Sequence, residues 1–192
     1  MRKYLSSLLL LCATLTWQSC LHEDTNVFST SAIDRIENAA QETQKTLESA
    51  PNGWLLRYYA GENYTGPAYS ILMKFANGHA TVASDYDPDK VTTAAYSIAK
   101  DQGVVLSFDS YNESIHQFSR VWEGSGARGI EGDYEFLVLS TSADTIRLRG
   151  KKWKNNMELV RVPEKTEWKS YLTSIYNLQE QLTTQFFALR LG

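Results

Sequence analysis

The middle of the chain alternates between apolar and polar side chains at every second position, as a strand with one buried face does. Tyr134, Phe136 and Val138, for example, are separated by polar or outward-facing positions. This period of two predicts strands at 54–60, 69–76, 79–84, 94–99, 103–109, 133–140, 145–150 and 156–161. Because these strands have one wet face, a parallel sheet covered by helices on both sides is excluded.

The most distinct turn is Asn77-Gly78, a pair that supplies both positive φ angles of a two-residue type I′ hairpin. A loop of that length sets the pairing of the two flanking strands. The pairs on the mainly apolar face are Phe75 with Ala80, Met73 with Val82, and Ile71 with Ser84. They share one face, as a half-buried hairpin requires.

Helical spacing appears on both sides of the strand region. Residues 31–49 carry apolar positions three and four apart, and Pro51-Asn52-Gly53 ends this predicted helix. After Pro163, the segment 164–182 shows a second stripe of the same kind. The chain then ends on apolar residues, so we expect the tail to pack back on the barrel, or the sequence to be cut within a longer protein.

These patterns predict a mainly β (α+β) fold: an antiparallel barrel or sandwich of about eight strands, with an N-terminal and a C-terminal helix. A strand-rich meander that begins with a Gly-Trp strand resembles a lipocalin-like barrel in general plan, and a Greek-key sandwich gives a similar pattern. The expected divisions are 1–20, a signal peptide; 21–30, a tether; 31–163, a helix with the β domain; and 164–192, a C-terminal helical segment.

The first twenty residues have the three parts of a secretory signal. Arg2 and Lys3 precede an apolar run from Leu5 to Leu15, which is shorter than the roughly 20 residues that a helix needs to cross a bilayer. The run is therefore expected to be cleaved rather than to anchor the protein.

Both cysteines lie in this leader: Cys12 is inside the apolar run and Cys20 is at the expected cleavage point. A mature chain with one cysteine at its start cannot form an internal disulfide, and it suggests a lipid attachment point, such as palmitate and related acyl chains, at Cys20. Ser19-Cys20 resembles the end of a bacterial lipobox of the loose Bacteroidetes kind. The plain alternative is secretion with a stray cysteine.

The net charge of the chain limits the classes of partner that it can bind. The chain has a formal net charge of −3, and residues 21–192 carry 17 Lys and Arg against 22 Asp and Glu. A nucleic-acid binder would need a basic face, so this class is excluded. The acidic stretch Leu21-His22-Glu23-Asp24 resembles the export signal of Bacteroidetes surface lipoproteins. We expect an outer membrane lipoprotein that faces the cell surface, with the periplasmic face as the alternative.

Chemical motifs are weak. The stretch 124–129 matches the letters G-x-G-x-x-G, but a strand follows it where a dinucleotide site needs a helix, so we expect a loop and no cofactor. Asp85, Asp87 and Asp89 alternate but lack the later ligands of a calcium loop, which predicts a solvated turn. The three histidines have no metal-ligand spacing, so no metal site is expected.

Aromatic residues near predicted loops are the one suggestive feature, because such rings stack on sugar faces and line apolar pockets. The alternative is that many of these rings are core residues. The candidate ligand-binding residues are Tyr58, Tyr111, His116, Trp122 and Arg128, and no catalytic residue is proposed.

Several motifs together resemble a known family. They are Pro51-Asn52-Gly53-Trp54, Lys74-Phe75, the stretch 101–109 with Tyr111-Asn112 and His116, Gly132-Asp133-Tyr134-Glu135-Phe136, and Ser142-Ala143-Asp144 running into Gly150-Lys151-Lys152. The chain is similar over residues 1–185 to Bacteroidetes lipoproteins of the domain of unknown function 4302. The resemblance implies a location and an architecture and transfers no catalytic residue.

The expected function is that of a lipid-anchored cell-envelope protein whose non-catalytic β domain binds a small molecule, a glycan or a protein partner. One alternative is an extracellular glycan hydrolase, which needs two carboxylates facing each other in a groove. The other is a structural subunit of a surface complex, which an exposed apolar patch at 186–191 would favour.

Overall fold

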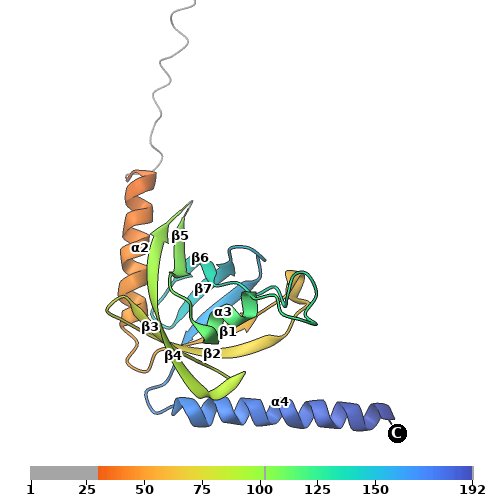
Figure 1. The fold of residues 1–192 in the computed structure, drawn as a ribbon. Helices are drawn as coiled ribbons and strands as arrows, with labels where there is room; N and C mark the ends of the chain where they lie inside the picture. The colour runs from red at the N-terminus through yellow and green to blue at the C-terminus, as the bar shows by residue number, and fades with distance from the viewer. Residues whose placement is uncertain (1–29, 102, 192) are drawn as a thin grey trace, which may run out of the picture. The chain divides into compact units, whose positions relative to one another are not determined.

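Eight antiparallel strands close into a barrel in the computed structural model of the chain (Figure 1), which describes residues 30–101 and 103–191, the last five by backbone only. The strands are β1 (Trp54–Tyr59), β2 (Ala68–Ala76), β3 (His79–Ser84), β4 (Asp87–Lys100), β5 (Val104–Phe108), β6 (Glu135–Thr141), β7 (Thr145–Gly150) and β8 (Asn156–Arg161). Each strand pairs with its neighbour in sequence, and β8 closes on β1. The predicted mainly β fold is confirmed as a barrel, and the sandwich alternative is wrong.

The predictions for residues 1–29, including Cys20, lie outside the described residues.

The hairpin between β2 and β3 has the predicted register. Phe75 pairs with Ala80 and Met73 with Val82. Asn77 and Gly78 have φ angles of 52° and 73°, as the tight turn requires.

The strand β4 extends beyond the segment in which apolar and polar residues alternate. The alternation predicted only 94–99, whereas β4 begins at Asp87 and pairs with β3 from Ser84 onward, with a register shift at Ala83. Residues 87–93 alternate between exposed and half-buried positions, and the half-buried face carries Pro88, Lys90 and Thr92 rather than large apolar side chains. The sequence therefore shows no apolar alternation there, and backbone pairing holds this part of the strand.

Apolar side chains fill the interior of the barrel. Large side chains from the strands and loops, all at most 2% exposed, pack together: Trp54, Leu56, Tyr58, Ile71, Met73, Phe75, Phe108, Phe118, Phe136, Leu148 and Leu159. The helix α2 (Ala32–Glu48) adds Leu47 to this core. The indole Nε1 of Trp54 donates to the carbonyl oxygen of Leu47 at 2.9 Å, which joins α2 to β1.

The helix α4 (Trp168–Leu191) lies against the outer wall and continues beyond it in Figure 1. Its start is set by Glu167, whose carboxylate accepts the backbone N–H groups of Lys169 and Ser170. Leu172 is buried against Leu72 on β2. The tail therefore packs back on the barrel only in its first half. No helix among residues 30–101 and 103–191 is long and apolar enough to cross a membrane.

Candidate ligand-binding site

One end of the barrel is covered by the long connection 109–134 between β5 and β6; we call this end the mouth. The connection contains α3 (Glu113–His116) and the 3-10 turn η3 (Gln117–Ser119). Ile115 and Phe118 are at most 1% exposed and belong to the interior cluster. Their burial fixes this connection to the barrel and gives the mouth a defined surface.

Four aromatic side chains form that surface. The rings of Tyr69 and Phe118 are stacked with centroids 4.3 Å apart, and the ring of Tyr86 meets both edge-on at about 6 Å. Trp122 completes the wall of a cavity of 270 Å³, the mouth pocket. Tyr86 is 57% exposed and Trp122 is 45% exposed, so both rings present area to a ligand.

The rim of the mouth pocket is polar. Glu113, Gln117 and Arg120 line it. Glu113 forms an ion pair with Lys90 of β4, and the Nη1 of Arg120 donates to the hydroxyl of Tyr111 at 3.4 Å. Exposed aromatic rings beside amide and charged groups suit a ligand with a flat apolar face and hydroxyl groups at its edge.

A buried hydrogen-bond network holds the mouth to the barrel. The hydroxyl of Tyr58 donates to the carbonyl oxygen of Asp133 at 2.9 Å. The carboxylate of Asp133 accepts the backbone N–H groups of Lys152 and Trp153 at 2.7 and 3.2 Å. Burial raises the pKa of Asp133. A Cβ on Gly150 would lie 2.1 Å from Oδ2 of Asp133, so this close approach requires glycine.

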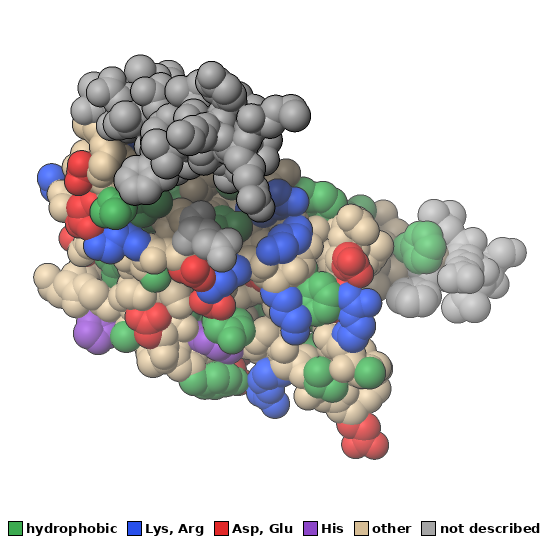
Figure 2. Space-filling view, turned by 90° about the horizontal axis from the view of Figure 1, so that it is seen from above, with side chains coloured by type: hydrophobic (Ala, Val, Ile, Leu, Met, Phe, Trp, Pro, Cys, Tyr) green, Lys and Arg blue, Asp and Glu red, His purple; other side chains and the backbone are tan. Residues whose placement is uncertain are grey.

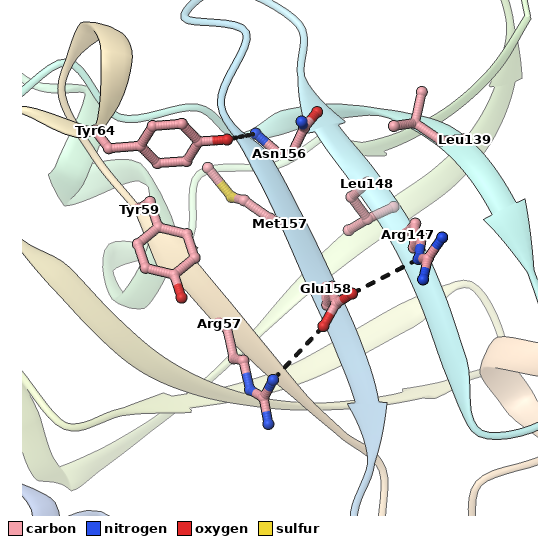
Figure 3. Close-up of a pocket in the computed structure, with 9 residues that line it drawn as sticks. All are labelled: Arg57, Tyr59, Tyr64, Leu139, Arg147, Leu148, Asn156, Met157 and Glu158. Atoms are coloured by element: carbon pink, nitrogen blue, oxygen red, sulfur yellow. Dashed lines mark hydrogen bonds and ion pairs between the residues drawn. The ribbon is translucent and has the colours of Figure 1, made fainter.

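A second cavity, of 590 Å³, lies on the outside of the barrel over β1, β8 and β7 (Figure 3); we call it the outer-wall groove. Arg57 and Arg147 lie on either side of Glu158, with nitrogen-to-oxygen distances of 3.5 and 3.6 Å. Tyr59 and Tyr64 stand at one end of the groove, with ring centroids 5.7 Å apart and an edge-to-face geometry.

A comparison with models of known protein families assigns the chain to a family. Residues 24–189 match the model of a domain of unknown function (DUF4302). The chain belongs to this family. Searches of curated proteins and of solved structures found no match. The predicted resemblance to this family is therefore confirmed, and the match spans the whole barrel and nearly all of α4.

Three of the predicted ligand-binding residues of this DUF4302 domain lie at the mouth. Trp122 lines the mouth pocket, and Tyr111 is connected to it through Arg120. The ring of His116 lies between those of Tyr111 and Tyr134, at 5.4 and 4.6 Å. Burial lowers the pKa of His116, so its neutral form is favoured.

The other two predicted residues lie elsewhere. Tyr58 is 0% exposed in the interior, and burial raises its pKa well above the usual value, so the structure places it in the core rather than at a ligand surface. Arg128 forms ion pairs with Glu62 and Glu131, and its guanidinium lies 4.5 Å from the centroid of the Trp153 ring. It links two loops.

From the sequence, Tyr86 counts among the aromatic residues near predicted loops but was not made a candidate ligand-binding residue, and Arg57 and Arg147 were not selected at all. Tyr86 is in the turn between β3 and β4, and only the fold brings it to Phe118. The outward position of Arg147 follows from the alternation of β7, but its approach to Arg57 depends on β8 closing on β1. Within the described part of the chain, no group of three His, Cys, Asp or Glu side chains is placed to hold a metal ion.

Proposed function

We propose that the chain is a lipid-anchored protein of the bacterial outer membrane, displayed at the cell surface, whose barrel binds a glycan without catalysing a reaction. The leader with Cys20 supports the anchor, and the acidic stretch after it supports surface display. The binding proposal depends on the mouth pocket.

The observation that carries the binding proposal is the pair of exposed rings, Tyr86 and Trp122, above the stacked rings of Tyr69 and Phe118. A sugar ring offers an apolar face for stacking and hydroxyl groups for the polar rim. A cavity of 270 Å³ is close to the lower limit of small-ligand pockets, which suits one ring better than a long lipid.

The test of binding is a glycan and lipid screen of the purified protein, followed by titration of the best ligand. Trp122→Ala and Tyr86→Ala are each expected to weaken binding about tenfold, which corresponds to the loss of one aromatic contact of about 1.4 kcal/mol. Tyr176→Ala, which removes an exposed ring from α4, is the matched control and should leave affinity unchanged. Equal affinities for all four proteins would refute the mouth as the binding site.

The test of the anchor is fractionation of cells that produce the Cys20→Ala variant. Release of this variant from the membrane fraction, with Cys12→Ala still retained, is expected if acyl chains on Cys20 hold the protein. Retention of Cys20→Ala in the membrane would contradict the anchor.

One observation favours a second role, as a structural subunit. Leu178, Leu182 and Phe186 are exposed apolar side chains spaced four residues apart on the second half of α4. Figure 2 shows hydrophobic area on the part of the molecule that projects to the right. Residues 187–191, which the sequence placed in this patch, have no described side chains. The hydrolase alternative needs two carboxylates that face each other in a groove. The mouth pocket and the outer-wall groove each contain one carboxyl group. A third cavity, of 450 Å³, contains Asp133 and Glu135, but the first accepts backbone N–H groups of the β7–β8 turn and the second is paired with Lys151.

A further inference from the structure

The outer-wall groove has a charge opposite to that of the whole chain. The chain carries a formal net charge of −3, yet the lining of the groove contains Arg57 and Arg147 against the single carboxylate of Glu158. Tyr59 and Tyr64 stand beside this charge. We propose that the outer-wall groove binds an acidic sugar of a glycan, with the sugar carboxylate on the two guanidinium groups and the sugar ring on the two tyrosines.

Both guanidinium groups retain donors for a ligand. Their distances to Glu158, 3.5 and 3.6 Å, are longer than the 2.7–3.2 Å of a normal N–H···O hydrogen bond. Each guanidinium has five N–H groups in a planar fork that fits a carboxylate in a bidentate manner. The side chains of Arg57 and Arg147 are 55% and 68% exposed, so a carboxylate reaches them from solvent. The carboxylate of Glu158 lies between them and competes with a ligand carboxylate for both.

The spacing of the two arginines is set by the barrel. Arg57 pairs with Glu158 across β1 and β8, and Glu158 pairs with Arg147 across β8 and β7. Neighbouring strands lie about 4.8 Å apart, so the two arginine backbones are about 10 Å apart with their side chains on one face. One anion between them is within reach of both, and the cavity of 590 Å³ has room for the ring that carries it.

Tyr59 and Tyr64 favour a sugar over a simple anion, because their rings offer a surface on which a sugar ring can stack. The hydroxyl of Tyr64 accepts the backbone N–H of Asn156 at 2.9 Å, and the backbone N–H of Tyr64 donates to Oδ1 of Asn155 at 3.3 Å. Tyr64 is thereby held in place, and Tyr59 meets it edge-to-face. Rings that are fixed before binding lose little conformational entropy when a ligand stacks on them. An acidic peptide would use the arginines but would have no flat ring for these two side chains.

The test is calorimetric titration of the purified protein with trimers of galacturonate, glucuronate and mannuronate, and with their methyl esters, which keep the ring and remove the charge. We expect at least one acid trimer to bind and its ester to bind about tenfold more weakly. Arg57→Gln and Arg147→Gln should each weaken binding of the acid about tenfold. Glu158→Gln should tighten it about threefold, because the competing carboxylate is lost.

The opposite sign expected for Glu158→Gln separates binding from a fold defect, since a misfolded variant would not gain affinity. Lys74→Gln, which removes one exposed positive charge from β2 outside the groove, is the matched control and should leave affinity unchanged. Four outcomes would overturn the proposal: no binding of any acid trimer, equal binding of acid and ester, weaker binding by Glu158→Gln, or equal binding of a polyaspartate peptide. Trp122→Ala tests the mouth and should not change binding here, so the two sites fail independently.

Discussion

The interior of the barrel and its mouth are both rich in aromatic residues, but the rings differ in exposure and in how they are held. Trp54 in the interior is 0% exposed, and its indole N–H is bonded to Leu47 of α2. Trp122 at the mouth is nearly half exposed, and its loop is held by Ser125, whose hydroxyl donates to the carbonyl oxygen of Trp122 and accepts its N–H. The comparison shows that residue type alone does not separate a packed ring from an exposed ring; the position of the ring relative to the closed wall does.

A closed wall with a filled interior also sets where a ligand can bind. The interior positions carry large apolar side chains in mutual contact, so the cavities of 270 and 590 Å³ lie at the mouth and on the outer wall. The barrel acts as a rigid support on which exposed rings and charges are arranged.

The largest expected effect tests the interior. Trp54→Ala should lower the free energy of unfolding by about 3–5 kcal/mol, because it leaves a cavity and removes the bond to Leu47. Urea denaturation followed by circular dichroism measures this loss. Trp122→Ala, with the same change of side chain, should cost less than about 0.5 kcal/mol. Similar losses for the two variants would remove the distinction between the two regions.

Tyr58 lies where the interior meets the mouth, and its substitution tests the boundary. Tyr58→Phe keeps the ring but leaves the buried carbonyl oxygen of Asp133 without its donor, so we expect a loss of about 1 kcal/mol in unfolding free energy. Ligand affinity at the mouth should stay unchanged, since the ring is enclosed. A normal stability combined with weaker binding would instead make Tyr58 a ligand contact, as the sequence had indicated.

The period of two was enough to predict the barrel strands and the register of the β2 and β3 hairpin, and apolar positions three and four residues apart predicted the two flanking helices. These features depend on which side chains of a short segment are buried, and the spacing of apolar residues within that segment indicates this directly. The start of β4 was missed because residues 87–93 pair by backbone outside the core. Asp85 was expected in a solvated turn but is buried, because α4 packs over this part of the wall. Its Oδ2 accepts the backbone N–H of Ser70 at 3.0 Å and the Nε2 of Gln179, on α4, at 3.2 Å.

The sites were predicted less well than the fold, because they join residues that are far apart in the chain. The mouth joins Tyr86 to Trp122, and the outer-wall groove joins Arg57 to Arg147. The motif Gly132-Asp133 was noticed as part of a family resemblance, but its physical reason appears only in the fold. A Cβ on Gly132 would lie 2.4 Å from the hydroxyl oxygen of Tyr58. The spacing of residues along the sequence does not predict such close contacts between residues that are far apart in the chain.

The buried carboxyl of Asp85 gives a smaller effect that depends on pH. Burial raises its pKa, and its Oδ1 has no hydrogen-bond partner among the described residues. The folded state therefore holds this proton more tightly than the unfolded chain does. The resulting contribution to stability is fully present below the ordinary aspartate pKa and is lost as the pH rises through the higher folded pKa.

The Asp85→Asn variant should be more stable than the wild-type protein at neutral pH, by less than about 1 kcal/mol, and this advantage should disappear in acid. Urea denaturation at a series of pH values measures the difference. Asp87→Asn, at an exposed position of β4, is the control for the loss of a negative charge. An advantage of Asp85→Asn that grows toward acid would show that the carboxylate is stabilised, not penalised, by its surroundings.

The smallest expected effect extends the comparison to α4, where apolar side chains face outward. Leu172 in the first half is 0% exposed, whereas Leu182 in the second half is 58% exposed. Leu182→Ser should therefore change the unfolding free energy by less than about 0.5 kcal/mol at any protein concentration, because no packing is lost. If the loss exceeds about 1 kcal/mol and grows as the protein concentration rises, the stripe is buried in an assembly, since only an assembled state makes stability depend on concentration. That result would favour the structural-subunit role over an isolated binding domain.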